Sequence, residues 1–168
     1  MAGAERLIYE LVRFAQQNNL TPTVLIVNNY SMEYYDDILK NMGVKVVRTT
    51  IGSTSRLKSP VNIAKSLYWQ IKLKYFAKAA YESIHVIGLY NVPKIINDVV
   101  HSHRFYWHVT NSSQYFNEEF DYPEHIFQNP DDTIVYINSY QIDEIHDQYG
   151  SQAVKCKTSL FKLFVADE

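Results

Sequence analysis

The apolar residues of this chain fall into two patterns, short continuous runs and longer amphipathic stretches. Short β-branched runs without strict alternation are typical of strands that are covered on both faces. Five such runs predict strands, which we place at Thr23–Asn28, Val44–Arg48, Ile84–Leu89, Phe105–Thr110 and Thr133–Asn138.

Stretches with apolar residues three and four positions apart lie between these runs and predict helices. The predicted helices cover Ala4–Asn19, Ser31–Met42, a long segment from Pro60 to about Tyr81, a shorter one from Pro93 to about Val100, and Tyr140–Tyr149.

The boundaries of these helices carry recognisable signals. Serine is a favoured N-cap, so we expect Ser31 and Ser139 to cap the second and the last helix. Proline is favoured at the first helical position, which places the start of the long helix at Pro60. Glycine supplies the left-handed residue that follows a helix, so Gly43 and Gly150 are predicted to end the helices before them.

Helices and strands that alternate along a chain imply a mostly parallel sheet with helices on both faces. We therefore predict a single Rossmann-like α/β domain over residues 1–168, with three αβα layers. Its first element is a helix, whereas a doubly wound domain normally begins with a central strand. Either that strand is absent, or another segment takes its place, or the chain is a fragment. An irregular stretch, Asn111–Asp132, interrupts the pattern, and loops of this length are usually functional or partly helical.

Composition narrows the cellular setting. The single cysteine, Cys156, cannot form an internal disulfide, which suits a reducing compartment. No signal peptide opens the chain, and no run reaches the roughly 18 apolar residues of a membrane span. We therefore expect a cytoplasmic protein, which can still lie at the inner face of a membrane. The formal net charge of −2 gives no general signal for nucleic acid.

Several familiar ligand motifs are missing from the sequence. Its five glycines do not form the GxGxxG motif of a dinucleotide site, and neither a P-loop, a CxxC nor an HExxH motif is present. The closest pair of histidines, His101 and His103, lacks the companions of a full ligand set, so we predict no metal. We likewise predict no resident cofactor.

The opening residues are more informative. Gly3 and Ala4 form a small-residue turn at the start of a helix, where free backbone N–H groups meet the positive end of the helix dipole. Such a turn lets an anionic or polyhydroxyl ligand approach the backbone closely.

Gly-Ala-Glu-Arg at residues 3–6, followed by an amphipathic helix, resembles the Gly-Gly-Ala-Glu-Arg motif of a large family of retaining glycosyltransferases with the GT-B fold. The segments that follow resemble the family in its own order over nearly the whole chain: TVLIVN, YYDDILKNMGVKVVR, a basic helix, IHVIGLYN, WHVTNSS and IVYINSYQIDEIHDQYG. Two departures stand out, since Ala2 replaces the first glycine of the motif and the preceding strand is missing.

The resemblance implies half of a two-domain enzyme. In that family the N-terminal Rossmann-like domain holds the acceptor, and the C-terminal domain holds the nucleotide-sugar and a paired acidic motif. This chain would be the acceptor-binding half, for a glycan or lipid-linked acceptor. The donor would be bound mainly by a missing or separate C-terminal domain, so the chain alone would be inactive.

Three positions take on roles through the resemblance. Gly3 and Ala4 would line the cleft near the transferred sugar and the donor phosphates. His108 would contact a sugar hydroxyl or stabilise charge beside the reaction centre, although a histidine that is simply hydrogen-bonded at a strand end is the alternative.

Three further side chains are weaker candidates for the acceptor site. Ser139 follows the last predicted strand and can reach the cleft, although helix capping explains it fully. Arg56 and Lys58 precede the long helix and could meet a phosphate on the acceptor.

Charge is distributed unevenly along the chain. Residues 56–80 carry six basic residues and no acid, whereas residues 111–154 carry nine acids and neither Lys nor Arg. A basic helix with aromatic residues can lie on anionic lipid, which would make membrane-surface residues of Lys65, Trp69, Lys72, Lys74 and Lys78. The alternative is an ordinary helix that packs on the sheet and leaves its lysines in water.

Two other functions compete with sugar transfer. The chain could be a non-catalytic binding or interaction domain of flavodoxin-like shape, because it lacks a complete set of active-site residues. It could also be a truncated gene product. A nucleotide that bound tightly to this chain would contradict its assignment as the acceptor half.

Overall fold

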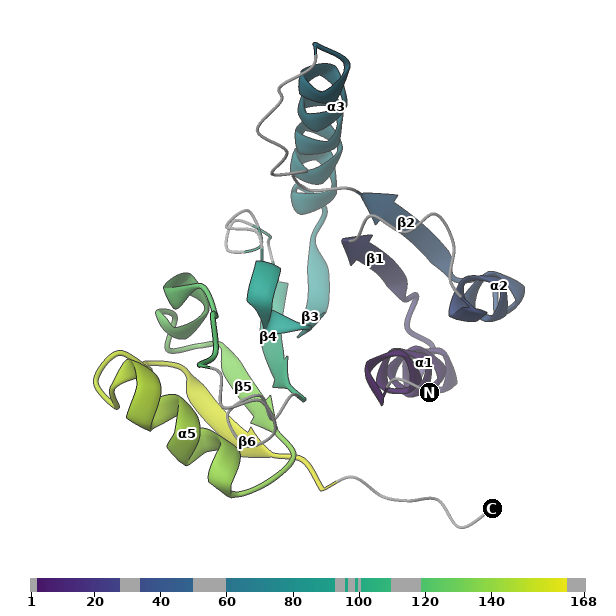
Figure 1. Ribbon diagram of the computed structural model, residues 1–168. Coiled ribbons are helices and arrows are strands. Elements are labelled where there is room, and N and C mark those ends of the chain that lie inside the picture. Colours follow the sequence, from purple (N-terminus) through teal and green to yellow (C-terminus); the bar gives the residue numbers. More distant parts are fainter. Residues whose placement is uncertain are drawn as a thin grey trace. The chain divides into compact units, whose positions relative to one another are not determined.

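The computed structural model divides into two compact units, Met1–Phe76 and Ala77–Glu168, each of which is described by itself (Figure 1). The structure describes residues 3–27, 34–49, 60–92, 96, 99, 101–109 and 119–162. Most of the helix predicted from Pro93 to Val100 lies outside these residues, as do the Ser31 cap and the segment that precedes Pro60.

The first unit consists of α1 (Gly3–Gln17), β1 (Thr23–Val27), α2 (Tyr34–Asn41), β2 (Lys45–Thr49) and α3 (Pro60–Ala77). Its two strands are parallel, with Thr23 opposite Lys45 and Val27 opposite Thr49. A small core forms where Val12 of α1 and Leu39 of α2 meet Val44. Gly43 has the predicted left-handed backbone, with φ of 74°, and its N–H bonds the carbonyl of Lys40 at 2.9 Å.

The long helix begins at Pro60 as predicted, but it ends at Ala77. Its predicted end near Tyr81 is wrong, because Tyr81 already belongs to the next strand, β3 (Tyr81–Ile87). Ala79 and Ala80 favour helix locally, yet pairing of Tyr81 with His101 of the neighbouring strand commits the following residues to the sheet.

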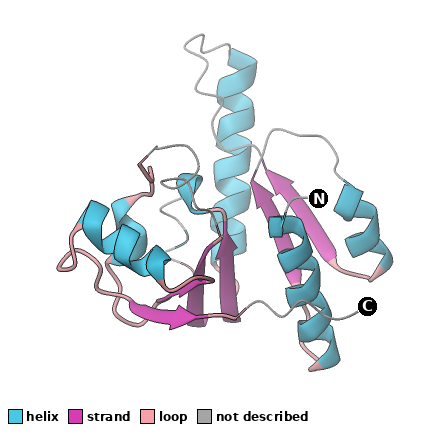
Figure 2. Ribbon diagram, turned by 60° about the horizontal axis from the view of Figure 1, so that its bottom comes forward, coloured by secondary structure: helices cyan, strands magenta, loops and turns pink. Residues whose placement is uncertain are grey.

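The second unit carries a four-stranded sheet in the order β3-β4-β5-β6, in which all neighbouring strands are parallel. Its remaining elements are η1 (Leu89–Asn91), β4 (His101–His108), η3 (Glu124–Phe127), β5 (Thr133–Tyr136), α5 (Tyr140–Tyr149) and β6 (Lys157–Leu160). In Figure 2 the strands of each unit are magenta and the helices cyan. The predicted α/β class with parallel strands is thus confirmed.

One face of the second sheet carries the core of its unit. Tyr106 and Ile134 are fully buried on this face, where they meet Ile126 and Phe127 of η3 and Ile145 of α5. Successive strand residues point to opposite faces, so β4 turns Arg104, Tyr106 and His108 toward this core. Phe105 and Trp107 point the other way.

The C-terminal end of α5 lies where the sequence predicts it. Gly150 ends the helix with φ of 83°, and its N–H bonds the carbonyl of His146 at 2.9 Å. Among the residues that the structure describes, no helix has both the length and the apolar character needed to cross a bilayer.

Candidate functional site

His108 is the last residue of β4 and lies opposite Tyr136, the last residue of β5. Because the strands are parallel, their carboxyl ends meet at one edge of the sheet, together with the end of β3 at Ile87. Open α/β sheets bind their ligands at this edge. The structure therefore puts His108 where a ligand site is expected from topology.

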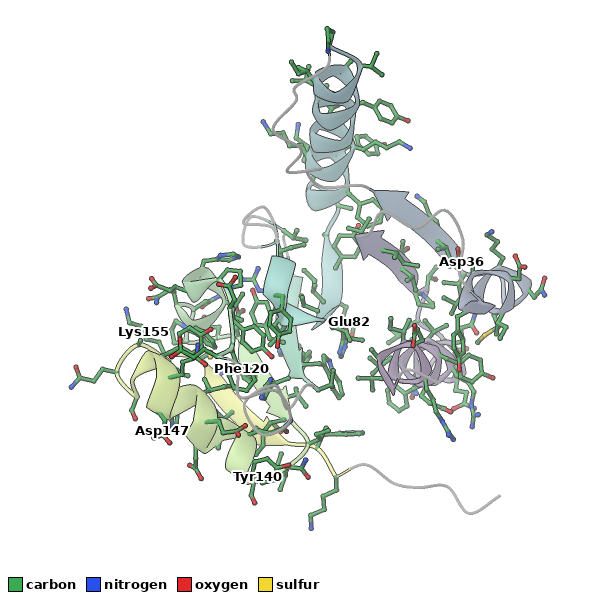
Figure 3. All side chains as sticks on the ribbon, in the orientation of Figure 1. Asp36, Glu82, Phe120, Tyr140, Asp147 and Lys155 are labelled. Carbon is green, nitrogen blue, oxygen red and sulfur yellow. The ribbon has the colours of Figure 1, made fainter. Side chains whose placement is uncertain are left out.

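The His108 ring is fully buried beneath two aromatic side chains. Phe120 lies edge-on to it, with 4.9 Å between ring centroids, and Tyr122 lies at 5.6 Å (Figure 3 labels Phe120). The Nδ1 atom is 2.8 Å from the Tyr122 hydroxyl oxygen. The Nε2 atom is also buried, but it has no hydrogen-bond partner among the residues that the structure describes.

The Tyr122 hydroxyl links His108 to a second tyrosine. It hydrogen-bonds the Tyr90 side chain, whose ring meets that of Tyr122 edge-on at 4.9 Å. A hydroxyl has one proton to donate. If Tyr122 donates it to Nδ1, the neutral imidazole keeps its proton on Nε2, which is then an unpaired donor. If Tyr122 accepts from Nδ1–H, Nε2 is an unpaired acceptor.

Burial sets the charge states of His108 and Tyr122. It lowers the pKa of His108 to about 4, because the charged ring would lose its hydration. Burial likewise raises the pKa of Tyr122 far above its usual range. Both groups are therefore neutral at pH 7, so the site can offer hydrogen bonds but no net charge.

A network from α5 holds the segment that covers His108. The backbone N–H of Tyr122 donates to the Tyr149 hydroxyl at 2.8 Å, and that hydroxyl donates to the Phe120 carbonyl. The Gln148 side chain accepts from the Phe120 N–H at 2.7 Å and donates to the same residue's carbonyl. The covering segment is thus tied to the last turns of α5.

None of these supporting residues was predicted as part of the site. Phe120 and Tyr122 belong to the irregular stretch Asn111–Asp132, whose length and aromatic content were the available signal. Tyr149 and Gln148 were assigned only to a helix. Their roles depend on which segment packs over β4, and local sequence patterns do not contain that information.

Ser139 does not cap α5, so the capping prediction is wrong. Its backbone is helical, with φ of −58° and ψ of −31°, and its side chain makes no capping hydrogen bond. The buried side chain of Gln141, in the first turn, instead binds the segment before the helix, since its Oε1 accepts from the N–H groups of Ile137 and Asn138 at 2.8 and 2.9 Å. Ser139 is exposed after the end of β5, and its predicted contact with an acceptor stays a prediction.

Gly3 and Ala4 open α1, as the sequence predicts. In the next position, Glu5 lines a hollow of about 50 Å³ in the first unit, and Ile26 near the end of β1 lines it too. The start of α1 thus lies beside the carboxyl end of β1. The other lining residues come from both helices and the strand: Ile8, Val24, Tyr35, Asp36 and Leu39. Gly3 and Ala4 belong to the first unit and His108 to the second.

The remaining predicted residues lie on or before α3. Arg56 and Lys58 are outside the described residues. Lys65 and Trp69 lie within α3, but their side chains are outside the described part of the structure. Three other positions on or just after the helix, Lys72, Lys74 and Lys78, are exposed.

Two further groups of the second unit are accounted for by the described residues: an ion pair and a thiol. Arg104 and Asp132 form a buried ion pair. Burial raises the pKa of the Cys156 thiol to about 11, so this buried thiol is protonated at neutral pH. Among the described residues no cluster of three or more His, Cys, Asp or Glu side chains is arranged to hold a metal ion.

Comparison with known proteins adds no assignment. No family model, no curated protein and no solved structure matches the chain.

Proposed function

We propose that this chain is the acceptor-binding half of a retaining glycosyltransferase, which moves a sugar from a nucleotide-sugar to a hydroxyl group of a glycan or lipid-linked acceptor. One observation carries the proposal: a buried histidine ends β4 at the carboxyl-terminal edge of a parallel sheet, with Nδ1 engaged and with Nε2 lacking a partner among the described residues. The motif order that resembles the family supports the same assignment.

In the proposed arrangement the Tyr90 hydroxyl donates to Tyr122, and Tyr122 donates to Nδ1 of His108. The Nε2–H group of His108 then becomes a donor without a partner. Leaving a buried donor unpaired costs about 1–3 kcal/mol, and a sugar hydroxyl oxygen that accepted from Nε2–H would recover it. His108 thus orients a hydroxyl group and does not act as a nucleophile.

Transfer would form a bond between the acceptor oxygen and the anomeric carbon, and break the bond from that carbon to the nucleotide diphosphate. The diphosphate leaves with the electron pair, and its leaving oxygen takes up the proton that the acceptor hydroxyl loses. Positioning and electrostatic stabilisation dominate such chemistry. We assign diphosphate binding to a separate C-terminal domain, and orientation of the acceptor hydroxyl to His108 of the second unit. The roles that the resemblance implies for Gly3, Ala4, Ser139, Arg56 and Lys58 stay predictions.

Access to His108 requires a local change. The ring has no exposed surface, because Phe120 and Tyr122 cover it. We propose that acceptor binding displaces this covering segment from the ring. The hydrogen bonds from Gln148 and Tyr149 set how much free energy that displacement costs.

A titration of the intact 168-residue chain tests the proposal. The probes are octyl β-glucoside, octyl β-galactoside, N-acetylglucosamine, UDP and UDP-glucose, and the readout is the His108 imidazole signal in a long-range ¹H–¹⁵N spectrum. We expect at least one sugar to shift this signal at millimolar concentration, and UDP to leave it unchanged. Because His108→Phe has no imidazole to observe at this position, the variants are compared through the backbone amide signal of Tyr122. His108→Phe should abolish the response of this amide to sugar, whereas His103→Phe, an exposed change on the same strand, should keep it. Tight UDP binding, or no sugar response at all, would refute the assignment.

The second candidate is a non-catalytic interaction domain. It is favoured by α3, on which several large apolar side chains are exposed. A chain that bound no sugar in the titration but engaged a surface through α3 would support this alternative. For either function we propose a cytoplasmic location, since the one cysteine is a buried free thiol.

A further inference from the structure

Helix α3 exposes far more apolar surface than an ordinary surface helix. Six large apolar side chains on it each expose more than half of their area, up to 81 % for Tyr75. They form what we call the apolar arc: Val61, Ile63, Leu67, Tyr68, Ile71 and Tyr75. Side chains stand out along this helix in Figure 3. Contiguous apolar patches of this kind usually mark an interaction surface.

The arc is continuous on one side of the helix. Successive residues of an α-helix are about 100° apart, so the six positions fall within roughly half of its circumference. On the same geometry Lys72 and Lys74 lie at the two edges of the arc. Both are exposed, and so is Lys78 just after the helix. The Lys72 ammonium lies over the Tyr68 ring, 5.1 Å from its centroid.

The charge of this surface is of one sign. The region 56–80 has no Asp or Glu to balance its bases. Lysine stems can lie along apolar surface while their ammonium groups reach outward. An apolar arc with lysines at its margins therefore complements a surface whose interior is apolar and whose boundary is anionic.

We propose that α3 lies flat on an anionic phospholipid bilayer, with the apolar arc at the boundary of the acyl chains and with Lys72, Lys74 and Lys78 at the lipid phosphates. A second copy of the chain fits this surface less well, because pairing two such arcs would bring lysines of one sign together. The proposal goes beyond sugar transfer and stands without it.

Vesicle flotation of the intact chain tests this proposal. We expect flotation with phosphatidylcholine vesicles that contain phosphatidylglycerol, little with pure phosphatidylcholine, and a decrease as salt rises. Each lysine near an anionic surface contributes about 1 kcal/mol, so changing Lys72, Lys74 and Lys78 to Glu should lower the partition coefficient by at least about 100-fold. The triple change of Lys40, Lys155 and Lys162 to Glu alters net charge equally, and it should have a much smaller effect.

A second variant separates insertion from simple charge attraction. Leu67→Gln with Ile71→Gln changes two exposed side chains, so the fold should persist by circular dichroism. Loss of their apolar burial should lower the partition coefficient at least tenfold. Equal binding of both variants and wild type would overturn the proposal, as would equal flotation with neutral vesicles. Absence of flotation would also overturn it. If sedimentation then showed a dimer that the Gln variant dissociates, the apolar arc would instead be an interface between two copies of the chain.

Discussion

The guanidinium of Arg104 and the carboxylate of Asp132 form an ion pair that is closed to solvent, with 2.9 Å between Nε and Oδ2. Their side chains are only 2 % and 1 % exposed. Arg104 also donates to the Ile96 carbonyl, and Asn129 donates to the second oxygen of Asp132 at 3.1 Å. The pair ties β4 to the turn before β5.

Removal of one partner from this pair should destabilise the protein strongly. We expect Arg104→Met to lower the free energy of unfolding by about 3–5 kcal/mol, because it leaves a buried carboxylate uncompensated. The double variant Arg104→Met, Asp132→Leu should lose less than the sum of the two single variants. Urea denaturation of the four proteins measures this coupling, and strictly additive losses would show that the pair contributes no interaction of its own.

Tyr122→Phe should change the tautomer of the His108 imidazole, although His108 itself is not substituted. The change removes the partner of Nδ1, and an unpaired buried nitrogen costs about 1–3 kcal/mol of unfolding free energy. In a long-range ¹H–¹⁵N spectrum, the wild type should show one neutral tautomer with the proton on Nε2, and the variant a mixture of both. Tyr90→Phe is the control, since Tyr122 can still donate to Nδ1. A wild-type ring protonated on Nδ1 would contradict the proposed donor role.

Stability should fall in mild acid because of His108. Its folded pKa of about 4 lies below the ordinary value of 6.5, so the unfolded chain binds a proton more readily in between. The contribution of the neutral ring is therefore fully present above pH 6.5 and is lost as the pH falls to 4, by about 3 kcal/mol at most.

The variant His108→Asn isolates this effect, because its side-chain amide can still meet the Tyr122 hydroxyl and does not titrate. Between pH 6.5 and 4 we expect the unfolding free energy of the wild type to fall more steeply than that of the variant. Parallel curves from urea denaturation would mean that the ring is not held neutral by the fold.

Gly43→Ala should cost about 1–2 kcal/mol, the usual penalty of a left-handed backbone for a residue with a Cβ. The backbone of Gly43 has φ of 74°, and no atom lies within 4 Å of the position a Cβ would take. The cost is therefore conformational and not steric. Gly43→Asn should cost less, because asparagine adopts this conformation more readily. Thermal melts of both variants decide this, and an alanine variant as stable as wild type would refute it.

The sequence predicted those elements whose signals are local. Pro60 opens α3, and Gly43 and Gly150 end their helices, because the backbone preferences of these residues act within one turn. The five predicted strands all appear, since continuous β-branched runs are strong indicators of buried strands. Their starts were less well placed: β4 begins at His101, four residues before the predicted Phe105, because pairing with β3 recruits a polar segment.

Features that depend on distant partners could not be read from the sequence. Lys157–Leu160 is short and polar, and it becomes strand β6 only because β5 offers it a free edge. The place of His108 near the end of a strand was predicted, but its surroundings were not. Tyr122 reaches the ring from 14 residues along the chain, and Tyr149, which bonds the backbone of Tyr122, is 27 residues further on. The sequence did not indicate that the Gln141 side chain folds back from α5 and accepts from the N–H groups of Ile137 and Asn138, the two residues before Ser139.

The position of β6 at the end of the sheet order has a practical consequence. Its outer backbone groups face away from β5, and Leu160 and Phe161 beside them are each more than a third exposed. An edge strand of this kind can pair with a strand of another molecule, so concentrated samples are at risk of edge-to-edge aggregation. Lys157 and Lys162 flank this edge with positive charge, and low ionic strength should therefore keep preparations of the protein monodisperse for longer.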